Sequence, residues 1–277
     1  MSTRTRRNAT QPQPWSRNQL RTATAAAAVL AVTTIGGTAI LIAHTVGPDL
    51  NVGGGASPGG GIAAPPPASA TRDRIAAAPM ASLDPSAATQ PDVAHVPAPP
   101  IRLPNSVEGR GPAGLPVYGH TVEGAVAQLA AIDIAVLEAM DVSHTAEVHR
   151  AWVMDGGPAL QDWDLSVNVA AFLRGARQGS AKDAATTVAV VPAGGLIKGT
   201  DGPDWVVACV LLDVRATIQT SYRMGWGHCA RMQWTAGRWQ IAPGAPPADA
   251  PSAWPGSKAA VQAGWLTWSS DEQEPLR

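Results

Sequence analysis

The sequence contains little lysine, phenylalanine or cysteine, and it carries no marked excess of charge of either sign. Lysine occurs only at Lys182, Lys198 and Lys258, phenylalanine only at Phe172, and the formal net charge of the 277 residues is −1. A near-neutral chain is not expected to bind nucleic acid through bulk charge. Because 45% of the residues are hydrophobic, the chain is also not expected to be disordered throughout.

The sequence also lacks a G-x-x-x-x-G-K-[ST] loop, which is the signature of P-loop ATP hydrolysis. Residues 109–114 match the dinucleotide-binding pattern G-x-G-x-x-G in letters, but they contain a proline and follow no predicted strand, so we interpret them as linker. His144 and His149 are five residues apart, whereas two zinc ligands on one helix face are four apart. We therefore predict no cofactor and no metal site.

From Thr22 to Pro48 no side chain is formally charged, and the preceding residues carry five arginines and no acidic group. The apolar stretch exceeds the roughly 20 residues that a helix needs to cross a bilayer. We predict a basic cytoplasmic tail over residues 1–21 and a transmembrane helix over residues 22–46, because the arginine-rich side of a span stays in the cytoplasm. A cleavable signal peptide is the alternative, although its apolar region is usually about 7–15 residues long.

Residues 47–116 are rich in proline, glycine and alanine, with runs such as Gly-Gly-Gly and Pro-Pro-Pro and almost no aromatic residue. Such a composition provides too little apolar surface for a core. It predicts a disordered, partly extended linker that spans at most roughly 3.1 Å per residue. The linker would hold the following domain away from the membrane.

Residues 117–244 carry the periodicities of a folded domain, and residues 245–277 are predicted to form a tail that docks on it in part. Helical spacing of apolar residues predicts one long helix, with Thr121 as its N-cap and Met140 near its end, and two shorter helices over about 145–154 and 164–178. Strands are predicted at 186–191, 205–218, 227–235 and 238–241, with turns at Gly194-Gly195 and Ala236-Gly237. This order predicts an α+β fold in which helices pack on a curved antiparallel sheet.

The two cysteines are too few for a disulfide scaffold, but they allow one disulfide. Cys209 lies beside Leu211 and Asp213, and Cys229 lies beside Arg231, so each cysteine is on the more polar face of its predicted strand. If the two strands pair as a hairpin, the cysteines can become cross-strand neighbours. An oxidising compartment outside the membrane would preserve their disulfide. The alternative is two small buried hydrophobic residues.

The order of three helices, long strands and a closing hairpin resembles the cone fold shared by ketosteroid isomerase and nuclear transport factor 2-like domains. The hairpin ends in Gly-x-Trp-x-Ile at residues 237–241, as is usual in that layout. The resemblance covers residues 118–243 and implies a cystatin-like arrangement. Cone-fold enzymes often place an Asp base and a Tyr or His partner in an internal pocket. In this chain such a pocket would use Asp133, Asp213, Tyr222 and His228.

The sequence around these four residues gives little support for a catalytic role. Asp133 lies between Ile132 and Ile134 on the long predicted helix, where a solvated face is expected. Asp213 begins the polar half of its strand beside Arg215, where an exposed ion pair is expected. We therefore predict no catalytic residue. A cell-envelope enzyme or small-molecule-binding protein that uses the cone pocket is the alternative.

The two edges of the domain resemble membrane-anchored proteins of actinobacterial integrative and conjugative elements. Residues 118–125, Tyr-Gly-His-Thr-Val-Glu-Gly-Ala, are similar to the opening motif of those proteins, and residues 263–268, Ala-Gly-Trp-Leu-Thr-Trp, are similar to the closing motif. Those proteins have a short basic cytoplasmic end, one membrane span, a Pro-rich linker and a cone-like outer domain. In Gram-negative type IV secretion, a single-pass protein with such an outer domain serves as an assembly factor.

These resemblances imply a non-enzymatic, single-pass membrane protein that is a structural or assembly subunit of a conjugative DNA-transfer apparatus. Its N-terminus would lie in the cytoplasm, and its extracytoplasmic domain would contact other subunits of a type IV secretion-like system or a second copy of itself. Direct nucleic-acid binding is not expected, because acidic residues offset the arginines that are interleaved with tryptophans.

Overall fold

The computed structural model describes residues 68–107 and 109–270. The predicted cytoplasmic tail, the predicted transmembrane helix and the first part of the predicted linker lie outside these residues. Within the described residues, no helix is both long enough and apolar enough to cross a membrane.

The described chain is an α+β fold with one curled, largely antiparallel sheet, as the sequence predicts. Its elements are, in chain order, α2 (Ala68–Ala77), η2 (Pro85–Ala88), β1 (Pro100–Leu103), η3 (Pro112–Gly114), α3 (Val122–Ala139), α4 (Val142–Trp152), α5 (Asp164–Gly175), β2 (Thr187–Thr200), β3 (Trp205–Thr217), β4 (Ser221–Thr235), β5 (Arg238–Ile241), α6 (Lys258–Gln262) and β6 (Leu266–Ser270). The strand order is β1-β6-β2-β3-β4-β5, and only the β1–β6 pairing is parallel.

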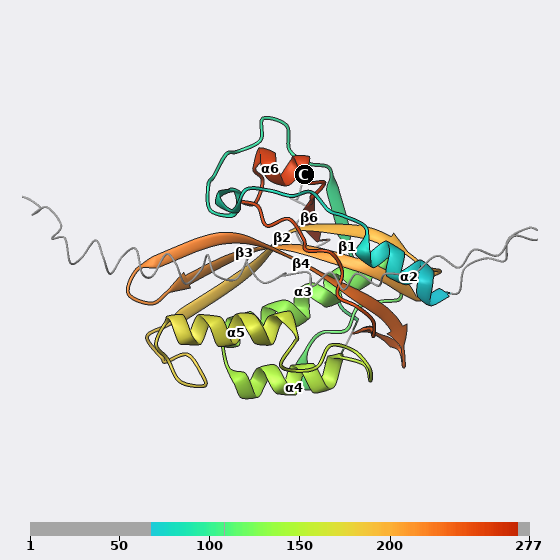
Figure 1. Ribbon diagram of the computed structural model, residues 1–277, viewed down its shortest axis with the longest axis horizontal. Helices are drawn as coiled ribbons and strands as arrows, with labels where there is room; N and C mark the ends of the chain where they lie inside the picture. The colour runs from blue at the N-terminus through green and yellow to red at the C-terminus, as the bar shows by residue number, and fades with distance from the viewer. Residues whose placement is uncertain (1–67, 108, 271–277) are drawn as a thin grey trace, which may run out of the picture.

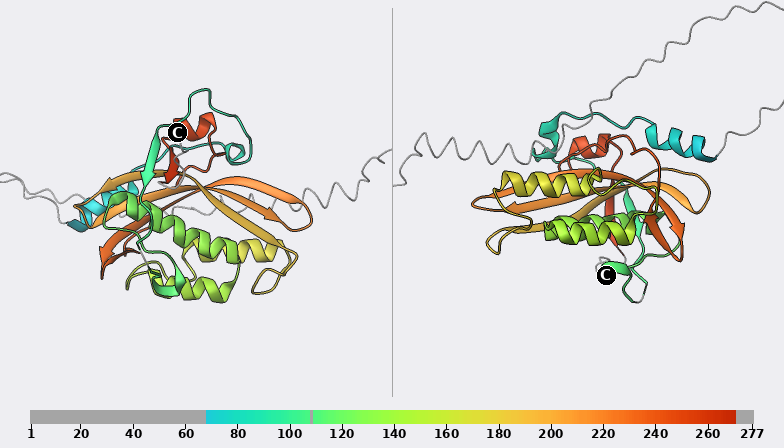
Figure 2. Two further views of the ribbon diagram at one scale, coloured as in Figure 1. Left: turned by 180° about the vertical axis from the view of Figure 1, so that it is seen from behind. Right: turned by 60° about the horizontal axis from the view of Figure 1, so that its bottom comes forward.

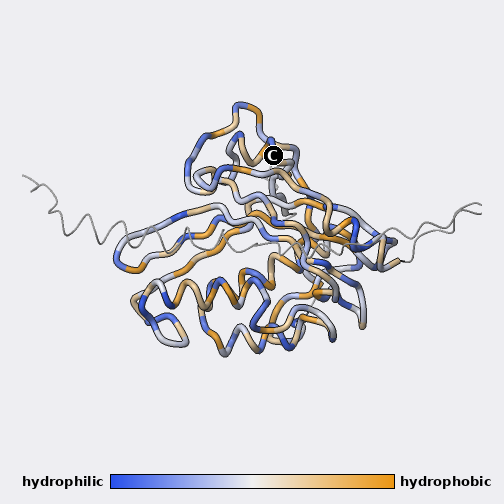
Figure 3. Tube along the Cα trace, viewed as in Figure 1, coloured by the Kyte–Doolittle hydropathy of each residue, from blue (hydrophilic) through white to orange (hydrophobic). Residues whose placement is uncertain are grey.

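The sheet is covered on both faces, but by different kinds of structure. The helices α3, α4 and α5 lie below it in Figure 1, whereas α6 and the irregular segments of both chain ends lie above it. The view from behind in Figure 2 shows the same layers. Hydrophobic residues recur among hydrophilic ones along the helices below the sheet (Figure 3), as expected for helices with one buried stripe.

The long helix α3 confirms the prediction from apolar spacing. The Thr121 side chain accepts a hydrogen bond from the Gly124 backbone N–H at 2.9 Å, and Met140 ends the helix in the left-handed region at φ 42°. The helix packs against α4, α5 and several strands. It therefore forms the central element of the lower layer.

The prediction of a turn at Gly194-Gly195 is wrong, because β2 continues through both glycines. A Cβ atom on Gly194 would lie 2.9 Å from the Leu266 carbonyl oxygen, and one on Gly195 would lie 3.0 Å from the side chain of Val126. The absence of side chains lets β6 approach β2 from one side and α3 approach from the sheet face. These glycines therefore serve close packing within a strand.

The prediction that residues 47–116 form a linker without packed structure is wrong for the described part. This part contains α2, η2 and β1, and Ile101 and Leu103 of β1 are 6% and 2% exposed. The Thr267 N–H donates to the Pro99 carbonyl at 2.9 Å, so alternate residues of β1 direct their backbone groups at β6. Pro100 and Pro104 lie at the alternate positions, whose backbone groups point away from β6. A strand at the edge of a sheet needs no N–H donor on that side.

The C-terminal tail is part of the fold as far as residue 270, since β6 lies between β1 and β2. The segment before α6 crosses β4 at two glycines. A Cβ atom on Gly225 would lie 1.8 Å from the Ala253 carbonyl oxygen, and one on Gly227 would lie 2.8 Å from the Pro251 carbonyl oxygen. The Trp265 indole N–H also donates to the Pro251 carbonyl at 2.9 Å. The tail is therefore pressed directly onto the sheet.

The second face of the β3–β4 pair is buried from Trp205 to Asp213 and exposed at Arg215 and Thr217. Trp205, Val207, Cys209 and Leu211 form a second buried cluster on this face, under α2 and the C-terminal segment. Cys209 and Cys229 stand directly opposite each other in the register and are joined by a disulfide. The disulfide therefore lies inside this upper core.

Replacing Gly225 by Ala tests how tightly the tail is held. The added methyl group overlaps backbone atoms of residue 253, so we expect a loss of about 1–3 kcal/mol in the free energy of unfolding. Urea denaturation measures the loss, and limited proteolysis should show earlier cleavage within 245–270. Gly119→Ala is the matched control, because a Cβ atom there meets nothing within 4 Å. Equal stability of the two variants would contradict the described path of the tail.

Candidate functional site

Asp133 on α3 and His228 on β4 form a buried pair between the helices and the sheet. The Asp133 Oδ2 atom lies 2.9 Å from the His228 Nδ1 atom, and the two residues are 0% and 6% exposed. The expectation that Asp133 lies on a solvated helix face is wrong. The sheet, α4 and α5 all pack against α3, so an acidic residue in the middle of the helix has no access to solvent.

The surroundings of the pair do not satisfy all of its polar atoms. Trp226, two residues earlier on β4, stacks on the His228 ring with the centroids 5.1 Å apart. Asp164, the 62% exposed first residue of α5, places its Oδ2 atom 3.8 Å from His228 Nε2. Among the described residues, none donates a hydrogen bond to the Asp133 Oδ1 atom. The pair thus runs from a fully buried carboxylate oxygen to the rim of the domain.

The pKa values of both groups are shifted upward, for opposite reasons. Burial raises the pKa of Asp133, because a carboxylate loses its hydration, and the charge of His228 offsets only part of this effect. Burial alone would lower the pKa of His228, but the charge of Asp133 and the hydrogen bond to it outweigh burial. The pKa of His228 is therefore raised above its usual value.

Asp213 and Tyr222 do not join this pair. Asp213 lies on the opposite face of the sheet, where it accepts hydrogen bonds from Arg223 at 2.7 Å and Arg215 at 2.8 Å. The expected ion pair with Arg215 is present, but Asp213 is buried, because the C-terminal segment crosses the sheet beside it. Burial acts to raise the pKa of Asp213, but the two guanidinium groups outweigh it and lower the pKa. Tyr222 lies six residues from His228 along β4, which is roughly 20 Å in an extended strand.

A histidine oriented by a buried carboxylate can act as a general base only if a substrate reaches it. The space between the helices and the sheet is filled by the main hydrophobic core, which includes the tryptophans Trp152, Trp163, Trp226 and Trp239. Neither of the two surface grooves described below is lined by Asp133 or His228. The geometry therefore supports a structural pair better than a reaction centre.

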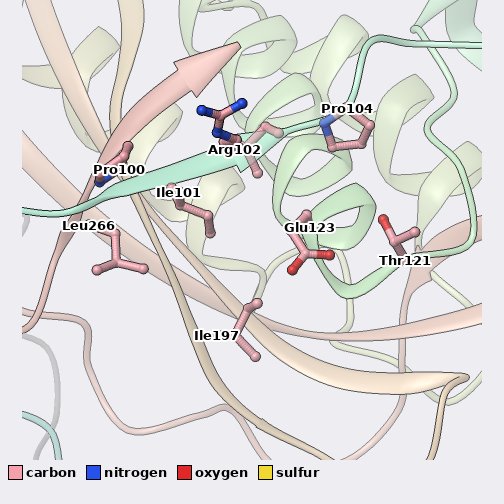
Figure 4. Close-up of a pocket in the computed structure, with 9 residues that line it drawn as sticks. Pro100, Ile101, Arg102, Pro104, Thr121, Glu123, Ile197 and Leu266 are labelled. Carbon is pink, nitrogen blue, oxygen red and sulfur yellow. The ribbon is translucent and has the colours of Figure 1, made fainter. Parts of the chain in front are cut away.

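The larger groove, of about 540 Å³, lies between β1 and the start of α3 (Figure 4). Ile101, Ile197 and Leu266 provide its apolar surface, and Arg102 and Glu123 provide its charged groups. The smaller groove, of about 350 Å³, follows an alanine-rich flank of α3 and is also lined by Tyr118 and Trp268. The sequence did not indicate the larger groove, because β1 was assigned to the linker. An alternation of apolar residues in Ile101-Arg-Leu103 was the available signal.

Removing one partner of the buried pair should be costly, whereas removing both should not. We expect Asp133→Ala to lower the free energy of unfolding by about 3–5 kcal/mol, because it leaves His228 buried without its partner. The double variant Asp133→Leu, His228→Leu should be much closer to the wild type, because apolar residues replace both charges. Urea denaturation of the purified proteins measures both effects. A double variant as unstable as the single one would contradict a purely structural pair.

The raised pKa of His228 also predicts how stability depends on pH. A protonated histidine favoured by the folded state contributes stability below its unfolded pKa of about 6.5, and the contribution is lost as pH rises through the folded value. We therefore expect the free energy of unfolding to decrease as the pH rises above about 6.5, and the His228→Gln variant to show a smaller decrease. Denaturation curves across this range provide the measurement. Stability that increases over the range would show that the direction is wrong.

Comparison with known proteins does not assign this site to a family. No protein-family model, no curated protein and no solved structure matches the chain.

Proposed function

We propose that the chain is a non-enzymatic, single-pass membrane component of a conjugative DNA-transfer apparatus, and that its outer domain docks with other subunits. The observation that supports this proposal best is the filled interior between α3 and the sheet, where the Asp133–His228 pair is enclosed by core residues. A cone-fold enzyme needs that space for its substrate. A docking domain needs only a stable surface.

The curled sheet with helices on one face is compatible with the cone fold that the order of elements suggests. The larger groove in Figure 4 offers a surface on which a partner subunit could dock. Its apolar groups supply area for burial, while Arg102 and Glu123 supply charges that restrict which partner fits. Docking through β1 would use side chains, because Pro100 and Pro104 blunt the free edge against strand addition.

The alternative function, an envelope enzyme or small-molecule binder, is favoured by one observation. His228 is oriented by Asp133 in the way that a general base is oriented by a buried carboxylate, and its Nε2 atom faces the exposed Asp164. Under this alternative, the core around Trp226 would have to open to admit a ligand. Chemical function would then depend on the identity of both members of the pair.

The two functions make opposite predictions for DNA transfer in a strain that lacks the gene. Under our proposal, the Asp133→Leu, His228→Leu protein restores the transfer frequency to near the wild-type value, because the pair only fills the core. Under the alternative, transfer stays at the level of the deletion although the protein accumulates normally. The frequency of transfer to a recipient strain, normalised to protein abundance, is the measurement.

The groove is tested in the same assay with a matched pair on β2. Ile197→Asp places a charge in the apolar groove and should lower transfer by about tenfold or more, as for a central interface residue. Val191→Asp changes an exposed residue of the same strand outside the groove and should have little effect. Wild-type transfer with both variants would argue against docking at this groove. Transfer that does not require the gene at all would contradict the proposed function as a whole.

A further inference from the structure

The helix α2 lies on the face of the sheet opposite α3, next to the C-terminal end of β2 (Figures 1 and 2). It is the first described element and lies within residues 47–116, which the sequence predicts as a linker, so any pull on the domain from its N-terminal side is applied first to α2. How α2 is held therefore determines where the tether ends and the domain begins.

Two ion pairs hold α2 near Trp205. In one pair the arginine belongs to α2, and in the other it belongs to β4. The Arg72 Nε atom lies 2.7 Å from Asp201 Oδ2, and the Arg231 guanidinium lies 2.8 Å from Asp73 Oδ1. Both guanidinium groups also lie over the buried Trp205 ring, at 5.4 Å and 6.0 Å from its centre. The helix contributes one cation and one carboxylate, Asp201 in the β2–β3 turn contributes the second carboxylate, and Arg231 of β4 contributes the second cation.

The apolar contact of α2 is small by comparison. Ala76 is the one residue of this helix that is fully buried, and Ile75 packs over Gly199, where a Cβ atom would lie 2.7 Å from the Ile75 side chain. The Ala76 carbonyl accepts hydrogen bonds from Lys198 Nζ at 2.7 Å and from the Ala248 N–H at 2.9 Å. A ten-residue helix is not stable alone in water, so α2 depends on these contacts.

The chain that follows α2 is anchored independently. The Met80 Sδ atom lies 3.5 Å from Cys229 Sγ, and Met80 and Leu83 pack on the upper core. Farther along, Asp92 pairs with Lys258, and the Lys258 N–H donates to the Asp92 carbonyl. The contacts between Asp92 and Lys258 do not involve α2. The boundary between weakly and firmly held chain therefore falls near residues 78–79.

We propose that α2 is a releasable clamp that leaves the sheet while the rest of the domain stays folded. Release uncovers Trp205 and Arg231, and it adds residues 68–79 to the tether, which lengthens it by at most about 37 Å at roughly 3.1 Å per residue. Local opening of a weakly packed terminal element is a property of many folded domains. The proposal concerns the domain itself and does not depend on the partners of the proposed function.

Gly199→Val tests the clamp without altering any residue of α2. Gly199 has an ordinary strand conformation, so valine fits the backbone, but its side chain collides with Ile75. We expect the amides of residues 69–77 to exchange with deuterium about tenfold faster or more in the full-length protein, while those of β3 and β4 remain unchanged. Gly179→Val is the matched control, because a Cβ atom there meets nothing within 4 Å.

Asp73→Ala tests the charge contacts and covers the case in which Gly199→Val destabilises the whole domain. Loss of one partly exposed ion pair should speed exchange in α2 by about two- to fivefold, and about 1 M salt should speed it in the wild type, because salt screens such pairs. Arg74→Ala is the control, since Arg74 contacts only Thr71 among the described side chains. Exchange in α2 that is as slow as in β3, in all variants and at high salt, would overturn the proposal.

Discussion

The β3–β4 pair is buried on both faces, and the rest of the structure follows from this constraint. All ten residues from Trp205 to Val214 are buried, so β3 lacks the alternation of a strand with one wet face. A compact layer of helices covers the lower face. The upper face is covered by what remains of the chain, namely the segments before β1 and after β5. The segments before β1 and after β5 are thus structural parts of the domain. The glycines of β4 lie at the positions where the C-terminal segment crosses the strand closely.

The parts of the fold that depend on local pattern were predictable, and the parts that depend on distant pairing were not. The spacing of apolar residues located α3, and the Thr121 cap located its start. The opposition of Cys209 and Cys229 followed from strand register. By contrast, β1 is stabilised by a strand more than 160 residues away, and its prolines lower its apparent strand tendency. Composition indicates only what a segment forms in isolation, whereas β1 is a strand because it pairs with β6.

The same distinction explains the candidate site. Asp133 and His228 were considered from the sequence, but the environment of Asp133 was misjudged, because a local pattern shows only that one helix face is apolar. Burial of the polar position of α3 results from elements that pack on it from three sides. A buried pair with its own hydrogen bond can link α3 to β4 in one arrangement.

The parallel pairing of β1 with β6 also constrains the order of folding. Pro100 is paired with Thr267, so this edge of the sheet joins residues from opposite ends of the domain. During synthesis, Ile101 and Leu103 have no strand to pair with until almost the entire domain has been made. Contacts of such high sequence separation form late and slow the folding rate. The sheet is therefore expected to be completed only after β6 has been synthesised, and until then β1 remains open to chaperones and to proteases.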